Sequence, residues 1–352
     1  MSEQFRLGFS RDFLASDGSL TYKDLGLHVL DAEPALKYEF FPRHEAVVQV
    51  DQLQDYDAVI SLAPRYTADS LRGVQRLVAL FRCGVGYDFV DVDACTENDV
   101  ALFITAGAVN HSVAEATLTW MLALSHRLVA KDQLLRQGRW AERVHYMGSE
   151  LRGKTLGVVG MGGIGTAIIE LLRGFGMKQP LAFDPYFQPE RAAELGVEAV
   201  SLEHLMSESD FISVNCPLTA GTRNLIHREH IARMKPTAFL INTARGGIVD
   251  DDALFDALSA HRIAGAATDV FANEPAGKDH RFVQLDNILL APHCIAWTDE
   301  LFCEMGTMAC QQAVDLSKGR IAHGLVNREV LDRPGFQRKL ENVRRGEPAF
   351  EQ

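Results

Sequence analysis

The chain has 352 residues, of which 47% are hydrophobic and 23% charged, and its formal net charge is −12. This length suits about two domains, and the composition excludes a wholly disordered, collagen-like or coiled-coil protein. The negative charge disfavours nucleic acid and acidic membrane surfaces as partners. No apolar run reaches the roughly 18 residues of a membrane span, and the N-terminal segment lacks the apolar core of a secretory signal. We therefore expect a cytoplasmic protein.

The first third of the chain predicts a small α/β unit. Strands are expected at 6–9, 57–62 and 77–81, and the last of them leads into a glycine turn at 83–86. A long helix is expected at about 111–137. Because this helix is apolar on most of its surface, we expect it to be buried, and we favour burial against a second copy of the chain over burial in the core.

The segment from 154 to 184 gives the strongest local signal. It predicts a strand, a glycine turn at 160–165, a helix at 166–175 and a second strand that ends at Asp184. Within the turn, the first glycine makes the bend, the second lets the backbone approach a pyrophosphate, and the last lets the helix pack closely on the strand. The helix N-terminus offers free N–H groups to the phosphates. A turn that binds nothing is the simpler alternative, but the whole context favours a dinucleotide site.

Asp184 lies 19 residues after Gly165 and indicates which dinucleotide binds. Its carboxylate can accept hydrogen bonds from a ribose hydroxyl and would repel a 2′-phosphate. The next two residues, Pro185 and Tyr186, offer no positive charge to such a phosphate. The sequence therefore favours NAD over NADP.

Further strands are expected at 211–214, 238–241, 265–268 and 288–290. Together they predict a doubly wound parallel sheet with helices on both faces. Arg245, Glu274 and His293 each follow one of these strands, and ligands of such sheets bind outside the carboxyl ends of the strands. Taken singly, these residues could be a surface cation, a turn residue and a structural histidine, but together they suggest one catalytic site.

The cysteines form no paired motif, so we expect reduced thiols and no metal site. They are Cys83, Cys95, Cys216, Cys294, Cys303 and Cys310. The tail from about residue 333 is polar and basic. We expect it to be a solvated face, with a mobile or swapped extension as the alternative.

Four motifs in order resemble the NAD-dependent D-isomer-specific 2-hydroxyacid dehydrogenases. They are the glycine turn, Asn-Thr-Ala-Arg-Gly-Gly-Ile-Val-Asp at 242–250, Asp-Val-Phe-Ala-Asn-Glu-Pro at 269–275, and Pro-His at 292–293. The resemblance extends to 82–88 and 110–115, and it covers most of residues 57–327.

The resemblance implies a Rossmann-type cofactor domain inserted into a smaller, flavodoxin-like α/β substrate domain. The dinucleotide-binding domain would span 107–291, and residues 1–106 and 292–352 would form the substrate domain. The active site would lie in the cleft between the two domains. Most members are dimers, so a homodimer is expected.

The resemblance also assigns catalytic roles. Arg245 would bind the carboxylate and carbonyl of a 2-keto acid, and the backbone N–H groups of Val85 and Gly86 would hold the other carboxylate oxygen. His293 would exchange the proton as general acid and base. Glu274 would pair with His293 and favour its protonated form.

Asp269 would orient the nicotinamide. The full set expected to bind NAD is Gly160, Gly162, Gly163, Ile164, Gly165, Asp184, Cys216, Pro217, Thr243, Arg245 and Asp269.

Several departures from the family pattern leave the substrate open. Phe89 replaces the usual Asn, and the stretch from Cys294 to Trp297 is unusual. Leu62 stands where phosphoglycerate-type members carry an Arg, and the nearest Arg here, Arg65, comes three residues later. A phosphite-type dehydrogenase and a non-catalytic, NAD-sensing dimeric regulator of the same fold stay open as alternatives.

Overall fold

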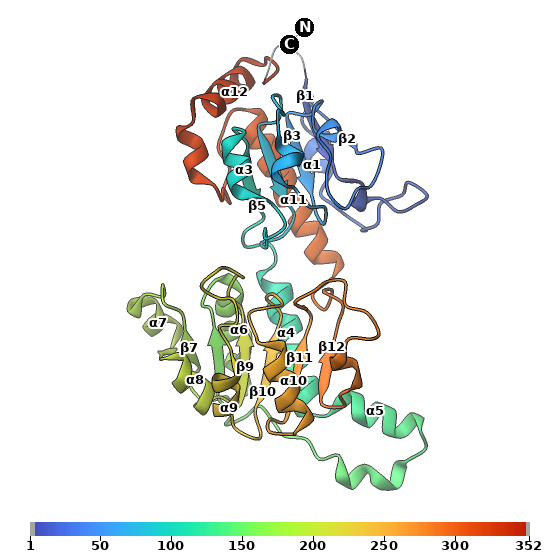
Figure 1. The fold of residues 1–352 in the computed structure, drawn as a ribbon, viewed down its shortest axis with the longest axis vertical. Coiled ribbons are helices and arrows are strands. Elements are labelled where there is room, and N and C mark those ends of the chain that lie inside the picture. Colours follow the sequence, from blue (N-terminus) through green and yellow to red (C-terminus); the bar gives the residue numbers. More distant parts are fainter. Residues whose placement is uncertain (1–3, 350–352) are drawn as a thin grey trace. The chain divides into compact units, whose positions relative to one another are not determined.

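The protein is described by a computed structural model that covers residues 4–349. Its backbone forms two compact units (Figure 1). Unit 1 combines residues up to 109 with those from 297 onward, and unit 2 is the continuous stretch 110–296. The expected boundaries were 107–291. Residues 293–295 stay with unit 2 because their backbone N–H groups donate to Asp269, as described below.

Unit 1 contains a five-stranded parallel sheet with the strand order β2-β1-β3-β4-β5. Its strands are β1 (Phe5–Phe9), β2 (Leu36–Phe40), β3 (Ala58–Ser61), β4 (Ala79–Arg82) and β5 (Ala101–Ile104). This is the flavodoxin-like order, so the expected substrate-domain fold is confirmed. The strand order reverses between β1 and β3. β3 is fully buried, as expected for an inner strand covered on both faces.

The helices of unit 1 come from both ends of the chain. They are α1 (His28–Asp31), α2 (Ala68–Leu71), α3 (Val92–Glu97), α11 (Asp299–Ser317) and α12 (Pro334–Arg345). Figure 1 shows the red C-terminal helices beside the blue N-terminal strands of this unit. The expected solvated basic face is present, because Arg338, Arg344 and Arg345 are exposed, but the tail also has a buried face that was not predicted. α12 buries Phe336, Leu340 and Val343, and the buried Lys339 donates a 2.7 Å hydrogen bond to the carbonyl of Leu77.

Unit 2 contains a seven-stranded parallel sheet with the order β12-β11-β10-β9-β6-β7-β8. Its strands are β6 (Leu156–Val159), β7 (Leu181–Phe183), β8 (Glu198–Ala199), β9 (Phe211–Val214), β10 (Phe239–Asn242), β11 (Gly265–Thr268) and β12 (Ile288–Leu290). The order reverses between β6 and β9. The sheet is therefore doubly wound in the Rossmann manner, as the sequence predicts.

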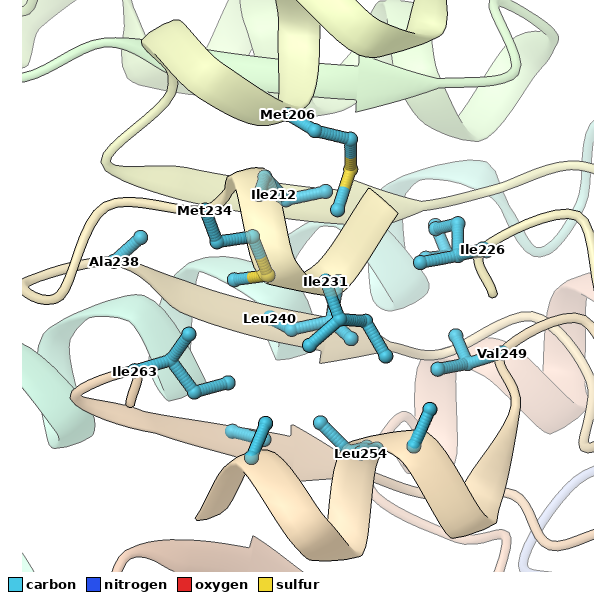
Figure 2. Packing of buried hydrophobic residues seen from close by; sticks show 14 of the residues in the cluster. Met206, Ile212, Ile226, Ile231, Met234, Ala238, Leu240, Val249, Leu254 and Ile263 are labelled. Carbon is cyan, nitrogen blue, oxygen red and sulfur yellow. The ribbon is translucent and has the colours of Figure 1, made fainter. Parts of the chain in front are cut away.

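Helices cover this sheet and supply its core. They are α4 (Asn110–Ser125), α5 (Leu128–Arg136), α6 (Gly163–Leu172), α7 (Pro189–Leu195), α8 (Leu202–Glu208), α9 (Arg228–Arg233) and α10 (Asp251–Ser259). Figure 2 shows Ile231 of α9 and Leu254 of α10 directed toward Leu240 of β10. This packing fixes the strands whose carboxyl ends carry the site.

The single long helix expected at 111–137 is two helices. Arg127 adopts a left-handed φ of +54°, which ends one helix before the next begins. The apolar residues Ala114, Trp120 and Met121 of α4 are buried inside unit 2, so their expected burial against a second copy was wrong. Apolar residues of α5 and of the following 3-10 helix (Trp140–His145) are instead exposed. Among residues 4–349, no helix is long and apolar enough to cross a membrane.

Candidate active site

The glycine turn lies at the point where the strand order of unit 2 reverses. Gly160 follows β6 with a φ of +96°, and a Cβ there would lie 2.7 Å from the backbone nitrogen of Cys216, which follows β9. A Cβ on Gly165 would lie 2.4 Å from the carbonyl oxygen of Gly160. Both positions therefore require glycine so that the backbone segments can approach. Gly163 is less strictly confined, because the atoms nearest to a Cβ there belong to the Asn110 side chain, which can move aside.

Gly162 is different from its neighbours in the turn. A Cβ at this position would meet no protein atom within 4 Å, so the space beside it is open to a ligand. Gly162 is also the N-cap of α6, and it supplies no side-chain cap to the N–H groups of the first turn. Gly163, Ile164 and Gly165 carry those groups. The turn thus has the free donors and the positive helix end that a pyrophosphate needs, and the residues fit a dinucleotide.

Asp184 follows β7 and stabilises the glycine turn. Its carboxylate accepts 2.8 Å hydrogen bonds from the backbone N–H groups of Met161 and Tyr186. The first bond joins the end of β7 to the turn after β6. The sequence indicates the ribose role of Asp184 but not this bond, which depends on how the two loops meet in space.

Cys216 and Pro217 follow β9 on the other side of the reversal. Burial raises the pKa of the Cys216 thiol to about 11, so the thiol stays protonated at neutral pH. A thiol that stays protonated is a weak nucleophile at neutral pH.

The loop after β10 carries Arg245. The buried side chain of Asn242 accepts from the N–H of Ala244 and donates to the carbonyl of Arg245, at 3.1 and 3.0 Å. These bonds fix the turn that also contains Thr243. Gly246 is needed because a Cβ there would overlap the backbone of Phe271, after β11. The loops that carry Arg245 and Glu274 are therefore packed backbone to backbone.

The structure brings Glu274 and His293 together. Glu274 Oε2 lies 2.8 Å from His293 Nδ1, and the other carboxylate oxygen accepts the N–H of Phe271 at 2.9 Å. Burial alone would raise the pKa of Glu274, but these two hydrogen bonds outweigh it, and the nearby Arg245 adds to their effect, so the pKa is lowered. The carboxylate is thus ionised at neutral pH. Because Nδ1 is engaged, Nε2 is the ring atom left to exchange a proton with a substrate.

Asp269 holds the backbone of the His293 segment. His293 has a left-handed φ of +54°, a conformation that side-chain-bearing residues rarely adopt. Its N–H donates to the Asp269 carbonyl at 2.8 Å, and the Asp269 carboxylate accepts the N–H groups of Cys294 and Ile295 at 2.8 and 3.2 Å. Burial raises the pKa of Asp269 to about 6, although these N–H groups oppose the shift. The sequence indicated only a cofactor role for this residue.

Val85 and Gly86 belong to unit 1, where they follow β4 and are partly buried. The preceding Gly84 has a φ of +114° and donates its N–H to Thr105 Oγ1 at 2.7 Å, which fixes the start of the loop. The ring of Phe89, the residue that departs from the family pattern, lies 5.1 Å from the Arg82 guanidinium, within cation–π distance. Within residues 4–349, no cluster of His, Cys, Asp and Glu could hold a metal ion.

The sequence is similar to known proteins of one dehydrogenase family. Residues 118–294 match the sequence profile of a family described as D-isomer specific 2-hydroxyacid dehydrogenase, NAD binding domain. The chain is 38% identical over 296 residues to a glyoxylate reductase from Korarchaeum cryptofilum, a match that covers 82% of this chain and 89% of that protein. It is also 38% identical over 280 residues to a D-3-phosphoglycerate dehydrogenase from Methanocaldococcus jannaschii, covering 79% of this chain and 53% of that protein.

Solved structures show the same architecture. D-lactate dehydrogenase from Aquifex aeolicus, complexed with NAD and lactic acid, superposes with a TM-score of 0.78 at 26% identity. The superposition covers 91% of this chain and 99% of that one. The similarity therefore extends over both units and is not confined to the glycine turn.

Proposed function

Since the chain belongs to the D-isomer specific 2-hydroxyacid dehydrogenase family, we propose that it interconverts a small or medium 2-keto acid, without a phosphate group, and the corresponding 2-hydroxy acid. Membership makes it an NAD-linked oxidoreductase of hydroxy and keto acids. The observation that carries the proposal is the 2.8 Å hydrogen bond between Glu274 and His293 at the carboxyl end of the sheet.

His293 is the proposed general acid and base. In reduction its Nε2 donates a proton to the oxygen of the keto group, and in oxidation the neutral ring takes that proton back. Glu274 keeps Nδ1 engaged and leaves Nε2 to face the keto oxygen. Asp269 accepts hydrogen bonds from the backbone N–H groups of 293–295 and so holds the segment that carries the imidazole ring.

Arg245 is the proposed ligand of the substrate carboxylate and keto oxygen. Its planar guanidinium can donate two parallel hydrogen bonds and can polarise the carbonyl at the same time. The backbone N–H groups of Val85 and Gly86 are the proposed donors to the second carboxylate oxygen. Both features select an acid whose carboxylate is adjacent to the reacting carbon.

NAD supplies the hydride chemistry when it is bound. In our proposal, residues 160–165 hold its pyrophosphate and Asp184 its ribose. Cys216, Pro217 and Thr243 line the cofactor, Arg245 lies beside it, and Asp269 orients the nicotinamide amide. The open space beside Gly162 and the uncapped N–H groups of α6 support this arrangement.

Two observations support an unphosphorylated substrate: the uncharged residue at position 62 and the names of the similar proteins. Leu62 follows β3 and offers no positive group to a phosphate. The relatives include proteins named glyoxylate reductase and D-3-phosphoglycerate dehydrogenase, and the absence of an Arg at position 62 favours the former class. The intact Arg245, Glu274 and His293 set favours an enzyme over a regulator that only senses NAD.

We further propose a cytoplasmic homodimer. An arm formed by α5 and the following residues up to 147 exposes a group of large apolar side chains, which is unusual for a monomer. They are Leu128, Val129, Leu135, Trp140, Val144 and Met147. A second copy of the same arm offers a complementary apolar surface.

A direct test follows NADH consumption with glyoxylate, pyruvate, hydroxypyruvate, longer 2-keto acids and 3-phosphohydroxypyruvate. We expect the highest kcat/KM with an unphosphorylated keto acid. The His293→Ala variant should lose roughly 10²–10⁴-fold, the usual contribution of a positioned acid–base group. A phosphorylated substrate as the best of the panel, or phosphite oxidation without keto-acid reduction, would reject the proposal.

A further inference from the structure

Gly163 leaves a space in the glycine turn that a side chain from another helix fills. Gly163 is the first residue of α6 and has no side chain of its own to offer to a ligand. The Cγ and Oδ1 atoms of Asn110 both lie 2.7 Å from the point where a Cβ on Gly163 would stand. The amide of Asn110, the first residue of α4, therefore occupies the volume that a side chain at position 163 would otherwise take.

The packing of α4 within unit 2 fixes the place of this amide. Ala114 of α4 and Ile168 of α6 are both fully buried in the same hydrophobic cluster. Three residues further along α4, Thr117 Oγ1 lies 3.4 Å from Thr243 Oγ1, in the loop after β10. α4 is thus attached both to α6 and to a loop that the proposed cofactor site uses.

The Asn110 amide has hydrogen-bonding capacity that the protein leaves unused. Among residues 4–349, no group accepts a hydrogen bond from it, although the residue is partly buried. The Nδ2 group of an asparagine can donate two hydrogen bonds and carries no charge. A polar group of this kind beside the first turn of α6 is available to a ligand of that turn.

The glycine turn contains no cation that could meet the negative charges of a pyrophosphate. No Lys or Arg occurs between positions 155 and 172, and Asp184, which is bonded to the turn, is negative. Hydrogen-bond donors and positive helix ends must therefore stabilise the phosphates. The first turns of α4 and α6 hold no acidic residue that would oppose this, and Asn110 adds a donor where the two helices begin.

We propose that Asn110 is a cofactor-binding residue whose Nδ2 group donates to the pyrophosphate of the dinucleotide and supplies the contact that Gly163 cannot make. The inference rests on the NAD site of the proposed function, and it adds to that site a residue from outside the glycine turn. It requires only residues of unit 2.

The test measures equilibrium binding by isothermal titration calorimetry, with NADH, ADP-ribose and adenosine as probes, of which only the first two contain the pyrophosphate. Asn110→Ala should raise the Kd of NADH and of ADP-ribose by about tenfold, as expected for the loss of a hydrogen bond to a charged group. The Kd of adenosine should change by less than about twofold, since adenosine has no phosphate to lose a contact. Asn110→Asp, which has nearly the same size but a negative charge, should raise the first two values by about 100-fold or more, and added salt should reduce this loss.

A double variant tests whether one position replaces the other. In Asn110→Ala combined with Gly163→Asn, the amide returns from position 163 into the space that the shortened side chain vacates, so most of the lost affinity should return. The control is His111→Ala, in the same turn of α4. The His111 side chain is 69% exposed and faces Glu115 at 3.6 Å, so none of the three Kd values should change. Thermal unfolding without ligand checks that each variant is folded.

Four results would overturn the inference. They are an unchanged NADH affinity in Asn110→Ala, an equal loss for adenosine, equal losses in Asn110→Ala and Asn110→Asp, and no recovery in the double variant. A wild type that binds NADH but reduces no keto acid would overturn the proposed function alone, and one that binds no NADH would overturn both.

Discussion

At the scale of single residues, the bond between Glu274 and His293 governs how the rate should depend on pH. Reduction needs a protonated His293, so kcat/KM should fall as the pH rises, and oxidation should show the opposite limb. Glu274 is ionised because its pKa is lowered, so it presents a negative charge to Nδ1 of His293. Glu274→Gln should move the alkaline limb of reduction down by roughly one pH unit or more.

The measurement is kcat/KM against pH in both directions. The loss in Glu274→Gln should be larger at pH 8 than at pH 6. Glu203→Gln is a matched control, because Glu203 also faces a histidine, His230 at 3.7 Å, away from the loops that carry the site. A limb that does not move in Glu274→Gln would show that this carboxylate does not act on the proton donor.

Asp184 is expected to determine whether the protein prefers NADH or NADPH. The wild type should prefer NADH over NADPH by about tenfold or more in kcat/KM, because the carboxylate repels a 2′-phosphate. Asp184→Asn removes the charge and keeps an oxygen for the N–H of Met161, so it should narrow the preference with little loss of stability. Asp184→Ala should narrow it too and also raise KM for NADH, because the bond to the glycine turn is lost. A wild-type preference for NADPH would contradict this assignment.

The same residues show how far the sequence predicts a site. Ordered motifs identified Arg245, Glu274 and His293, and the structure brings the last two into contact. The supporting roles of Asn242 and Asp269 were not predicted, since each depends on backbone N–H groups whose positions only the folded loops define. The left-handed backbone of His293 has no sequence signal either, because such strain is imposed by the surroundings.

At the scale of elements, α12 is docked through a buried lysine. Lys339 Nζ donates to the carbonyls of Leu77, Asn98 and Asp99 at 2.7 to 3.2 Å, and burial lowers its pKa to about 8. The folded state therefore binds fewer protons than the unfolded chain between pH 8 and the ordinary lysine range near 10.5. In that window this group makes the protein more stable as the pH rises.

Comparing the wild type with Lys339→Met isolates this effect. Above pH 8, the unfolding free energy of the wild type should rise relative to that of Lys339→Met by about 1 kcal/mol per pH unit. Denaturant unfolding at several pH values measures it, and Lys318→Met, at a partly exposed ion pair with Glu33, is the control. A difference that stays constant from pH 7 to 10 would mean that Lys339 is not held in a desolvated site.

The exposed arm makes a prediction about assembly. If the proposed dimer forms through the arm, Leu135→Lys combined with Val144→Lys, which places two charges on its apolar surface, should give monomers. Analytical ultracentrifugation measures the change, and Lys131→Ala on the same helix should leave the dimer intact. A wild type that is monomeric at micromolar concentration would refute the proposed interface.

Helices and strands could be predicted where a short stretch of sequence carries the pattern of buried and exposed residues. Buried runs such as 57–62 and 77–81 correctly indicated inner strands, whereas both edge strands of this sheet were missed. The side chains of β2 alternate between buried and exposed, but β5 was missed although its run is mostly buried. The break at Arg127 was missed because the sequence carries no glycine or proline there. α12 was taken for a solvated tail because its buried face includes a lysine.

At the scale of the whole molecule, the two units differ in how the chain builds them. Unit 2 is continuous, whereas unit 1 needs both ends: buried Asn327 accepts the N–H of Leu102 and donates to the carbonyl of Val100, at 2.8 and 2.9 Å. We predict that a fragment of residues 110–296 unfolds cooperatively and gains stability from NADH, because ligands stabilise the state that binds them. The fragment 1–109 should fold only when residues 297–352 are supplied. Circular dichroism of the fragments, apart and mixed, measures this; a cooperative transition in 1–109 alone would refute it.

The buried Asn327 also bears on how this protein is made. Chains usually fold during synthesis in order from the N-terminus, as each domain emerges from the ribosome. Here β1 to β5 emerge before unit 2, and they lack α11, Asn327 and α12 until unit 2 has been translated. Unit 2 can fold while the apolar side chains of β1 to β5 that α11 and α12 will cover are still exposed. The nascent chain would therefore depend most on chaperones for β1 to β5, and a premature stop before α11 would destabilise strands that had already been synthesised.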